Sequence, residues 1–398
     1  MRLRSIIVFI SFFLLVHSFV ICQQAFVSRP TVSKQLIHEF NFSSKLNEIS
    51  GVINWRNKLW AINDKGNKAK IYGIDPVSQK IDQVISIDNA ENIDWEDITQ
   101  DDNCIYIGDF GDNKGKRDDL CILKIFKKEI PFAGNIKVSA KKILFSYTDR
   151  PENIEGKHNF DCEAFISKGE YLYLFSKNRE NYKTSCYQIS KNEGLYNITA
   201  FSVFPINALV TGADYNPNTE ELILVGYTKK YSVPFIAVFW DFVDDNFFHG
   251  KNYKVDFIYN KGRQLEGVCF KEKRNLYLSC EATDFYEPSL FSFDYISWIN
   301  FDGINEDKLN KGLDGFKIIP NPGQKGWIKA DFTNLPKGNY VFRVMDEFGN
   351  ELIVREYRFK NKKDKFQIKI NTTEFAPGVY YVNIYSEDKF ATRKAIVY

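Results

Sequence analysis

The sequence is poor in several features that mark helical and nucleotide-dependent proteins. Only two Met and four His occur among its 398 residues, and no long Ala-, Glu- or Leu-rich tract predicts an extended helix. No GxGxxG, phosphate-binding loop, HExxH or GxSxG motif is present, so the usual signals of dinucleotide binding, zinc proteolysis and serine hydrolysis are missing. The net charge of +2 indicates neither a nucleic-acid surface nor an acidic polymer as partner. We therefore expect no nucleic-acid partner.

Cysteine is also sparse, with seven residues and no CxxC, and their spacing does not form a zinc site. Six remain if the chain is cut after Cys22, and an even number in an exported protein permits disulfides. Cys104 and Cys121 are about equally far from a predicted turn at Asp112 and Asn113, so they could face each other across a hairpin. Buried thiols without a bond are the alternative.

The chain instead has many aromatic residues and an internal repeat. Aromatic residues make up 16% of it, with 35 Phe and 22 Tyr, which favours strands. Five similar segments place a carboxylate at or just before a short apolar run, and a second apolar run follows each. The five first runs are Glu48–Val52, Asp94–Ile98, Asp161–Phe165, Gly212–Tyr215 and Leu265–Val268. A period of roughly 50 to 65 residues with about four strands per unit predicts a β-propeller.

We predict an all-β chain with a five-bladed propeller, or six-bladed as the alternative, followed by a small β-sandwich. The predicted blades cover Glu48–Ile87, Asp94–Tyr147, Asp161–Phe204, Ala213–Tyr259 and Glu266–Tyr295. The fifth blade lacks a fourth strand, while Gln35–Phe42 is a strand-like run without a partner. Pairing the two would close the ring and remove an exposed edge. A sixth blade would have to lie between Glu96 and Glu163, where the repeats are farthest apart.

The N-terminus predicts export. Arg2 and Arg4 precede the apolar run Ile6–Cys22, an order typical of a cleavable signal peptide at residues 1–22. A membrane anchor is the alternative, because the run is near the lower limit of about 18 residues for spanning a bilayer. A lipoprotein cysteine at Cys22 is disfavoured, since Ile21 stands where a small residue is expected. No later stretch is predicted to cross a membrane.

The repeat stops near Phe301 and a second domain follows. We assign residues 23–304 to the propeller, 305–312 to a linker and 313–398 to a small sandwich with alternating apolar runs. Its characteristic segments are Pro320–Pro322, Leu335–Tyr340, Asp346–Gly349, Ala376–Val382 and Lys389–Lys394.

This tail resembles the C-terminal sorting domain of the type IX secretion system of Bacteroidetes. The chain departs from that pattern in ending at Tyr398, without a basic residue after its last apolar run. The resemblance implies the secretion machinery as partner, export through the periplasm, and secretion or attachment to the outer cell surface. It also implies that the tail is read as an address. An ordinary sandwich or carbohydrate-binding module is the alternative.

The polar loops of the five blades predict a site on one face of the ring. Loops entering the innermost strands and loops joining the second and third strands open on the same side, so their side chains should share one rim. Ten positions are predicted to contact a ligand: Asp94, Asp97, Asp112, Asn113, Asp161, Lys177, Arg179, Lys229, Arg263 and Glu281. Candidates for catalysis are His158, Asp64 and Asp109, although no complete catalytic set can be assigned.

Carboxylates around one axis repel each other unless their pKa values rise or a cation lies between them. Their oxygen atoms suit Ca²⁺, which takes about 6–8 such ligands. We predict a calcium site formed by Glu96, Glu163, Asp214 and Glu266, with Glu48 as a further ligand. The alternative is that each carboxylate accepts backbone N–H bonds and closes a turn.

The propeller also resembles exported bacterial propellers of the SdiA-regulated, esterase-like phytase and calcium-dependent apyrase kinds. Three segments carry this resemblance: Glu48–Gly51 with Lys58–Asp64, Asp94–Ile98 with Ile105–Asp109, and Leu265–Val268. It implies calcium at the axis and, in some relatives, hydrolysis of phosphoesters or phosphoanhydrides. Two functions stay open: a calcium-binding module for an envelope or extracellular ligand, and a metal-dependent hydrolase. The missing acid–base pair favours the binding module.

Overall fold

The computed structural model describes residues 36–152, 154, 157–229, 232–272, 274–295, 310–311, 313, 315–346, 351–386 and 390–398. The predicted signal peptide and most of the predicted linker lie outside these ranges. Within them, no helix is long and apolar enough to cross a membrane.

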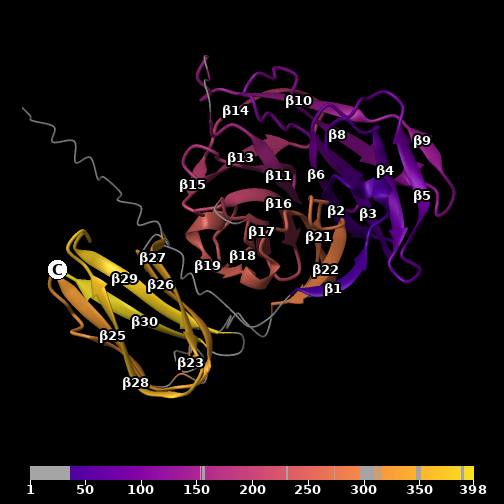
Figure 1. Cartoon of the computed structure of the whole chain (residues 1–398). Helices are drawn as coiled ribbons and strands as arrows, with labels where there is room; N and C mark the ends of the chain where they lie inside the picture. Colours follow the sequence, from indigo (N-terminus) through magenta and orange to yellow (C-terminus); the bar gives the residue numbers. More distant parts are fainter. Residues whose placement is uncertain are drawn as a thin grey trace, which may run out of the picture.

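Five β-sheets are arranged as the blades of a propeller, which confirms the predicted architecture (Figure 1). Blade 1 contains β2 (Ile49–Trp55), β3 (Lys58–Asn63), β4 (Lys70–Asp75) and β5 (Lys80–Ile87). Blade 2 contains β6 (Trp95–Gln100), β7 (Cys104–Asp109), β8 (Cys121–Phe126) and β10 (Lys141–Tyr147). Blade 3 contains β11 (Cys162–Lys168), β12 (Tyr171–Ser176), β13 (Thr184–Ser190) and β15 (Ser202–Phe204). Blade 4 contains β16 (Leu209–Asn216), β17 (Glu221–Tyr227), β18 (Pro234–Trp240) and β19 (Lys251–Asp256).

Blade 5 closes the ring with a strand from the other end of the propeller sequence. It contains β20 (Leu265–Glu272), β21 (Asn275–Cys280), β22 (Ser289–Asp294) and β1 (Ile37–Asn41), which pairs antiparallel with β22. The predicted closure by the run before the first blade is therefore confirmed. Because β21 pairs with one edge of β22 and β1 with the other, β22 has no edge of unpaired backbone N–H and C=O groups.

The long spacing between Glu96 and Glu163 contains an extra strand rather than a sixth blade. β9 (Ile136–Val138) pairs in parallel with β5, so this segment of blade 2 extends the outer edge of blade 1. β14 (Gly194–Ile198) likewise leaves blade 3 and pairs in parallel with β10 of blade 2. These two strands link neighbouring blades at the outer edge of the ring. The sequence pattern did not predict them.

Each innermost strand carries a β-bulge at the same place, which positions the site. In all five blades, one residue of the innermost strand has no partner in the second strand, and the pairing register shifts at this residue. The five bulged residues are Ser50, Glu96, Glu163, Thr211 and Glu266. A bulge re-aims a side chain relative to the regular pleat. The innermost strand of blade 4 begins at Leu209, four residues earlier than predicted, so Thr211 and not Asp214 occupies the bulge there.

The residues that directly follow the five bulged residues form a layer around the axis, and this layer contains four small residues and one carboxylate. Gly51, Ala164, Gly212 and Gly267 take this position in four blades, and Asp97 takes it in blade 2. A Cβ on Gly51 would lie 2.9 Å from Asp97 Oδ1 and 2.8 Å from the Ile98 nitrogen. Such distances are too short for a side chain, so the glycine makes room for the carboxylate.

Asp97 ties three innermost strands together at the axis. Its buried carboxylate accepts backbone N–H bonds from Ile98 at 2.8 Å, Phe165 of β11 at 3.1 Å and Ala213 of β16 at 3.3 Å. Buried carboxylates are tolerated when such donors surround them. Asp97 was predicted to lie on the rim, but the structure places it below the rim as a structural acceptor.

The six cysteines of the described chain are all buried and unbonded. The predicted approach of Cys104 to Cys121 is wrong, because the β7–β8 register pairs Cys104 with Phe126 and Asp109 with Cys121. The centre of this hairpin lies near Gly115 rather than at Asp112 and Asn113, so the two thiols lie at opposite ends of it. The alternative of buried, unbonded thiols is the one that the structure shows.

The C-terminal domain is a β-sandwich (orange to yellow in Figure 1). One sheet contains β27 (Glu351–Phe359), β26 (Gly338–Asp346), β29 (Gly378–Tyr385), β30 (Phe390–Val397) and β23 (Asn310–Lys311). The other contains β24 (Phe316–Ile319), β25 (Trp327–Leu335) and β28 (Lys363–Asn371). Alternate side chains of both sheets, including Phe332, Phe342, Ile370 and Val382, form one buried core, as expected for a sandwich.

Candidate functional site

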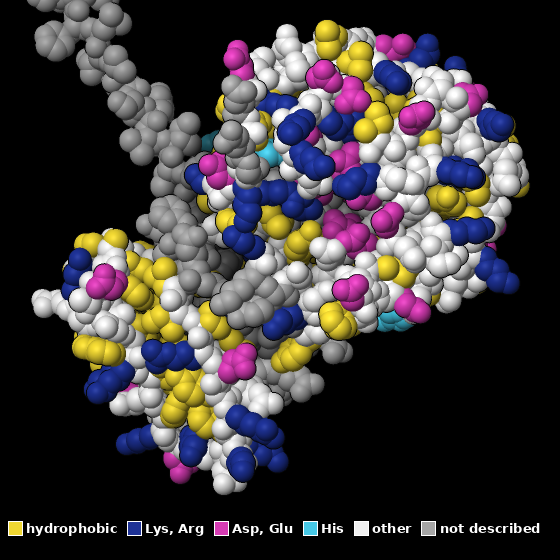
Figure 2. All heavy atoms as spheres, turned by 45° about the horizontal axis from the view of Figure 1, so that its top comes forward, with side chains coloured by type: hydrophobic (Ala, Val, Ile, Leu, Met, Phe, Trp, Pro, Cys, Tyr) yellow, Lys and Arg dark blue, Asp and Glu magenta, His cyan; other side chains and the backbone are white. Residues whose placement is uncertain are grey.

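Loops from the blades meet at one end of the ring, which we call the mouth. In four blades a residue just after the second strand donates its N–H to the carbonyl two positions before the bulge. These bonds are Asp64 to Glu48 at 2.8 Å, Gly111 to Asp94 at 3.2 Å, Lys177 to Asp161 at 2.7 Å and Glu281 to Gln264 at 3.2 Å. The two predicted kinds of loop therefore share one face. Figure 2 shows acidic and basic side chains gathered near the middle of the propeller.

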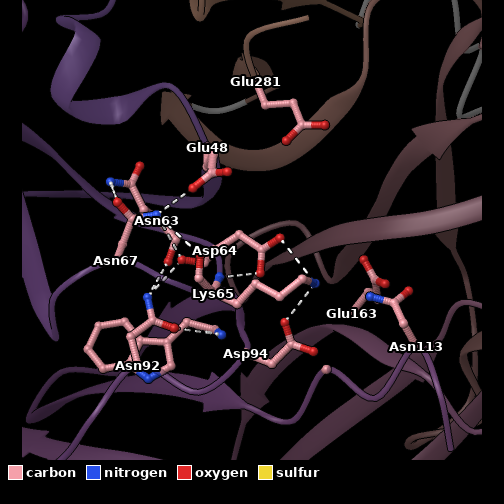
Figure 3. Close-up of polar contacts among 12 residues, drawn as sticks. Glu48, Asn63, Asp64, Lys65, Asn67, Asn92, Asp94, Asn113, Glu163 and Glu281 are labelled. Carbon is pink, nitrogen blue, oxygen red and sulfur yellow. Dashed lines mark hydrogen bonds and ion pairs between the residues drawn. The ribbon is translucent and has the colours of Figure 1, made fainter.

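Asp64, Asp94 and Glu96 form an acidic trio on one side of the mouth. One carboxylate oxygen from each residue lies within 4.8 Å of the other two. The ammonium group of Lys65 lies 3.0 Å from Asp94 Oδ1 and 3.7 Å from Asp64 Oδ2 (Figure 3). Because the Lys65 side chain is 51% exposed, it can turn toward solvent without disturbing the core.

Glu96 is the member of the trio whose buried carboxylate lacks a hydrogen-bond donor among the described residues. Its side chain is buried, and no donor hydrogen-bonds its carboxylate within the described part of the chain. Burial, together with the carboxylates of Glu163 and Asp64, raises the pKa of Glu96 well above its usual range. A Cβ on Gly111 would lie 2.0 Å from Glu96 Oε1, so the glycine lets this carboxylate lie against the loop backbone. An entering cation would remove the cost of its charge.

The opposite side of the mouth is a buried network of charges. Lys177 Nζ lies 2.8 Å from Glu163 Oε2, and Arg179 Nη2 lies 3.0 Å from Glu163 Oε1. Arg179 Nε also lies 2.8 Å from Asp161 Oδ2. Burial still raises the pKa of Glu163 to about 7 despite both cations. For Asp161 the effect of burial is outweighed by Arg179 and Lys177, so the pKa of its carboxyl is lowered.

Three further predicted acids complete the mouth. Glu266 lies close enough to Glu281 and Glu163 for their charges, added to burial, to raise its pKa well above the usual range. Burial and the charges of Asp64 and Glu48 raise the pKa of Glu281 to about 7. Glu281 accepts a hydrogen bond from Gln264. The exposed Glu48 accepts one from Asn67 at 2.6 Å.

Asp109, Asp112 and Asn113 hold the loop between β7 and β8. Asp109 Oδ1 accepts the Asp94 N–H at 3.1 Å and lies 2.9 Å from Arg117. Asp112 accepts the Lys116 N–H at 2.8 Å and lies 3.1 Å from Arg150 Nη1. Asn113 accepts a bond from Arg179. Each of the two carboxylates thus already has a backbone N–H donor and an arginine partner, so both hold the loop in place.

Asp214 is buried away from the trio. It accepts the Tyr215 N–H at 2.8 Å and the Phe270 N–H of β20 at 2.9 Å, and burial raises its pKa to about 7. Its charge acts on Asp97, which places both carboxylates in the layers below the bulges. The structure therefore does not bring Asp214 together with Glu96, Glu163 and Glu266.

Three other predicted residues do not contact the mouth carboxylates. Lys229 is exposed and lies 4.8 Å from the ring centroid of Tyr182. Arg263 lies 4.1 Å from the ring centroid of Tyr286. The buried His158 accepts the Phe160 N–H at Nδ1 at 3.2 Å, and a Cβ on Gly115 would lie 3.2 Å from its Nε2. Nδ1 of this imidazole therefore binds its own loop, and Nε2 lies beside the loop between β7 and β8.

Sequence reasoning missed several residues of the mouth. Lys65 directly follows the predicted Asp64, and its positive charge was the available signal. Arg117 and Arg150 neutralise Asp109 and Asp112, but Arg150 is distant in sequence and no pattern relates it to them. Thr211 and Ser50 fill bulge positions without a carboxylate, so the repeat of acids could not identify them.

The charges of the mouth do not balance. Its carboxylates are Glu48, Asp64, Asp94, Glu96, Asp161, Glu163, Glu266 and Glu281, whereas its cations are Lys65, Lys177 and Arg179. Burial and the neighbouring carboxylates raise the pKa values of Glu96, Glu163, Glu266 and Glu281. Protonation or a bound cation would relieve this excess of negative charge. Oxygen ligands alone, in loops of adaptable geometry, suit Ca²⁺. The acidic trio is thus chemically suited to this ion.

Residues 317–398 match the family of secretion system C-terminal sorting domains. This match confirms the predicted identity of the tail as a type IX sorting domain. The protein is accordingly exported, interacts with the secretion machinery, and is secreted or attached to the outer cell surface. No curated protein matches the chain.

Solved structures similar to the chain share little sequence with it. An exo-β-1,3-galactanase from Phanerochaete chrysosporium with galactose is 11% identical, with 93% of this chain and 100% of that chain covered and a TM-score of 0.43. A bifunctional GH43-CE protein from Bacteroides eggerthii is 8% identical, with 92% and 58% covered and a TM-score of 0.35. Scores of this size do not establish a shared activity.

Proposed function

We propose that the protein is a binding module of the cell exterior that holds Ca²⁺ at the mouth of its propeller and binds an envelope or extracellular ligand there. The observation that carries this proposal is the acidic trio, in which oxygens of Asp64, Asp94 and Glu96 lie within 4.8 Å of one another. Glu96 has no hydrogen-bond donor among the described residues, and a cation would supply its missing partner. Asp64, Asp94 and Glu96 would hold the ion.

Binding is favoured over catalysis by what surrounds the trio. Lys177 and Arg179 already form ion pairs with Glu163 and Asp161. These pairs stabilise the mouth, and neither cation is placed primarily to bind a substrate. His158 accepts a backbone N–H bond within its own loop and lies beside Gly115, and no other His lies among the predicted site residues. The exposed part of Arg179 and the amides of Asn67 and Asn113 leave polar groups around the trio. Such groups suit a hydroxylated or acidic ligand.

A metal-dependent hydrolase of phosphoesters or phosphoanhydrides is the second candidate. The observation that favours it is the pKa of Glu163, which burial raises to about 7. A carboxyl group with such a pKa can donate a proton near neutral pH. Turnover of a phosphoester that is lost in Glu163→Gln, with the fold and bound Ca²⁺ retained, would establish this candidate.

The test of the calcium site is thermal unfolding of the purified protein with millimolar Ca²⁺ and after chelation, with bound metal counted by elemental analysis. A free ion concentration about 100 times Kd stabilises the native state by about 2.7 kcal/mol, which raises Tm by several degrees. We expect this rise in the wild type and a much smaller one in Glu96→Gln and Asp94→Asn.

Asp82→Asn is the matched control, because it also removes one carboxylate but lies outside the mouth, 2.8 Å from Lys58 and 40% exposed. It should keep the full response to Ca²⁺. A wild type that neither binds metal nor gains stability would overturn the calcium site. If the rise in Tm with Ca²⁺ is the same for Glu96→Gln as for the wild type, the ion binds at another place than the trio.

A further inference from the structure

A second site lies at the other end of the ring. A cleft of about 860 Å³ is lined by the hairpin between β2 and β3, the hairpin between β6 and β7, and the hairpin between β11 and β12, together with β8 and the chain after β13. These hairpins join each innermost strand to its neighbour, so they lie at the end opposite the mouth. We call this space the basal cleft. Its volume is in the range of small-molecule sites.

The basal cleft is rich in positive charge. Its acidic residues are Asp101, Asp102 and Glu170, and its cationic residues are Arg56, Lys124, Lys127, Lys128 and Lys191. The excess of cations is the reverse of the situation at the mouth. Basic side chains from several blades that line one cleft raise the local concentration of anions.

Neutral acceptors, not carboxylates, hold three of these cations in place. Arg56 donates to the Ile130 carbonyl at 3.0 Å, and Lys124 donates to the Lys191 carbonyl at 3.0 Å. Lys127 donates to Gln100 Oε1 at 2.8 Å and to the Asp101 carbonyl at 2.6 Å. Within the described chain none of the three forms an ion pair. Their positions are therefore fixed by neutral groups and not by a paired carboxylate.

Lys191 is the exception, and its pairing organises the floor of the cleft. Its ammonium group lies 2.8 Å from Asp101 Oδ2, which also accepts the Tyr106 hydroxyl at 2.8 Å. Asp101 is thereby paired with Lys191, although its charge and that of Asp102 also act on Lys127. Burial lowers the pKa of Lys127 to about 8, which is the expected consequence of an ammonium group without a carboxylate partner.

The aromatic rings of Trp55, Tyr106 and Phe126 line the cleft beside the cations. The Arg56 guanidinium lies 4.0 Å from the ring centroid of Trp55 and 4.1 Å from that of Phe132, which lies outside the cleft lining. Lys127 lies 5.2 Å from Trp55, and Lys128 lies 5.3 Å from Phe126. These contacts hold the charged groups in defined directions at little further entropic cost. They also give apolar surface to the body of a ligand.

We propose that the basal cleft binds a small organic ester of phosphate or sulfate. A tetrahedral oxyanion presents oxygens in several directions and can meet Arg56, Lys124 and Lys127, which belong to different elements. A bare ion would leave most of the 860 Å³ empty, whereas the organic part of an ester fills it against Trp55 and Phe126. Phosphate and sulfate esters share this chemistry, and the experiment below distinguishes them. The proposal is independent of the calcium site.

The test is isothermal titration calorimetry of the full chain with glucose 6-phosphate, glucose 6-sulfate and glucose at low ionic strength. We expect one or both esters to bind and glucose not to bind. Loss of a charge-assisted contact weakens binding by about tenfold or more, so Arg56→Gln and Lys127→Gln should each raise Kd by at least this factor. The ester that binds more tightly identifies the source of the oxyanion.

Lys183→Gln is the matched control, since it removes one exposed charge outside the cleft, and it should leave Kd unchanged. Lys127 is buried and its variant can fail to fold, whereas Arg56 lies in a turn at the surface, so Arg56→Gln keeps the test decisive. Absence of binding by both esters would overturn the proposal. Binding that neither variant weakens, or that glucose reproduces, would overturn it as well.

Discussion

Carboxylates serve two different purposes in this ring. The number of hydrogen-bond donors around each carboxylate decides which purpose it serves. Asp97 and Glu96 are neighbours in sequence, yet Asp97 accepts three backbone N–H bonds whereas Glu96 accepts no hydrogen bond within the described chain. A carboxylate surrounded by donors stabilises the fold, and one without donors is available to a cation. The bulge between Trp95 and Asp97 separates the two by turning them to different levels of the axis.

Replacement of Asp97 by Ala should destabilise the propeller severely. The change leaves the buried N–H groups of Ile98, Phe165 and Ala213 without an acceptor, and each such group costs about 1–3 kcal/mol. We expect a loss of about 3 kcal/mol or more in the free energy of unfolding, measured by urea denaturation. Asp97→Asn keeps one acceptor oxygen and should lose less.

Asp82→Asn serves as the control for this comparison, because its carboxylate is exposed and its pair with Lys58 lies at the surface. It should change stability by less than about 1 kcal/mol. An Asp97→Ala protein as stable as the wild type would show that water or backbone rearrangement replaces the carboxylate at the axis.

At the site, the sequence predicted the face of the ring but not the grouping of its residues. Glu96, Glu163 and Glu266 were identified because the repeat places a carboxylate before an apolar run. Asp214 fits the same written pattern and yet stands three positions later than the bulge of its strand. The distinction depends on which backbone N–H groups surround each oxygen, and this is a property of contacts between blades that are distant in sequence.

Among the elements, the bounds of the predicted blades agree with those of the structure to within a few residues. The first two blades show the expected order of strands, because alternating apolar residues between Asn-, Asp- and Gly-rich turns define them locally. β9 and β14 were missed because each is short and pairs with a neighbouring blade. The repeat within one blade contains no information about such partners. β16 was placed four residues late because blade 4 lacks the expected carboxylate.

β1 is the element whose loss should most affect the ring. It contributes the buried Phe40 and covers the edge of β22, and the adjoining Phe42 is also buried. Burial of a large apolar side chain contributes about 1.5–3 kcal/mol, so a chain that begins after Phe42 should show a markedly lower Tm. The exposed edge should also promote association, which size-exclusion chromatography will detect.

A chain that begins at Leu36 keeps β1 and is the matched control. It should have the Tm and elution volume of the full protein. Equal Tm values for the two truncated chains would mean that β1 does not close the ring in solution.

At the scale of the whole molecule, the propeller has two chemically opposite ends and a separate domain for its delivery. The mouth concentrates carboxylates and the basal cleft concentrates lysine and arginine. A net charge of only +2 conceals this asymmetry, because the total does not record where on the molecule each charge lies. Composition alone therefore could not show that either end attracts a charged ligand.

Removal of residues 313–398 should abolish delivery to the cell exterior, since the sorting domain is the part that the secretion machinery reads. We expect the truncated protein to accumulate in the periplasm of a bacterium that has the type IX system, as measured by fractionation and immunodetection. A full-length Lys360→Gln variant, altered at one exposed position, should reach the surface normally. Undiminished surface protein after the truncation would contradict this role of the tail.

The pairing of β1 with β22 also sets a schedule for folding. The first strand of the propeller must wait for the last, since Ile37 pairs with Ser292 and Asn41 pairs with Ser289. At a synthesis rate of about 5–20 residues per second, the ring stays unclasped for roughly 10 to 50 seconds after β1 leaves the ribosome. β1 can therefore join blade 5 only after the rest of the propeller sequence is available, so closure of the ring is a late step in folding.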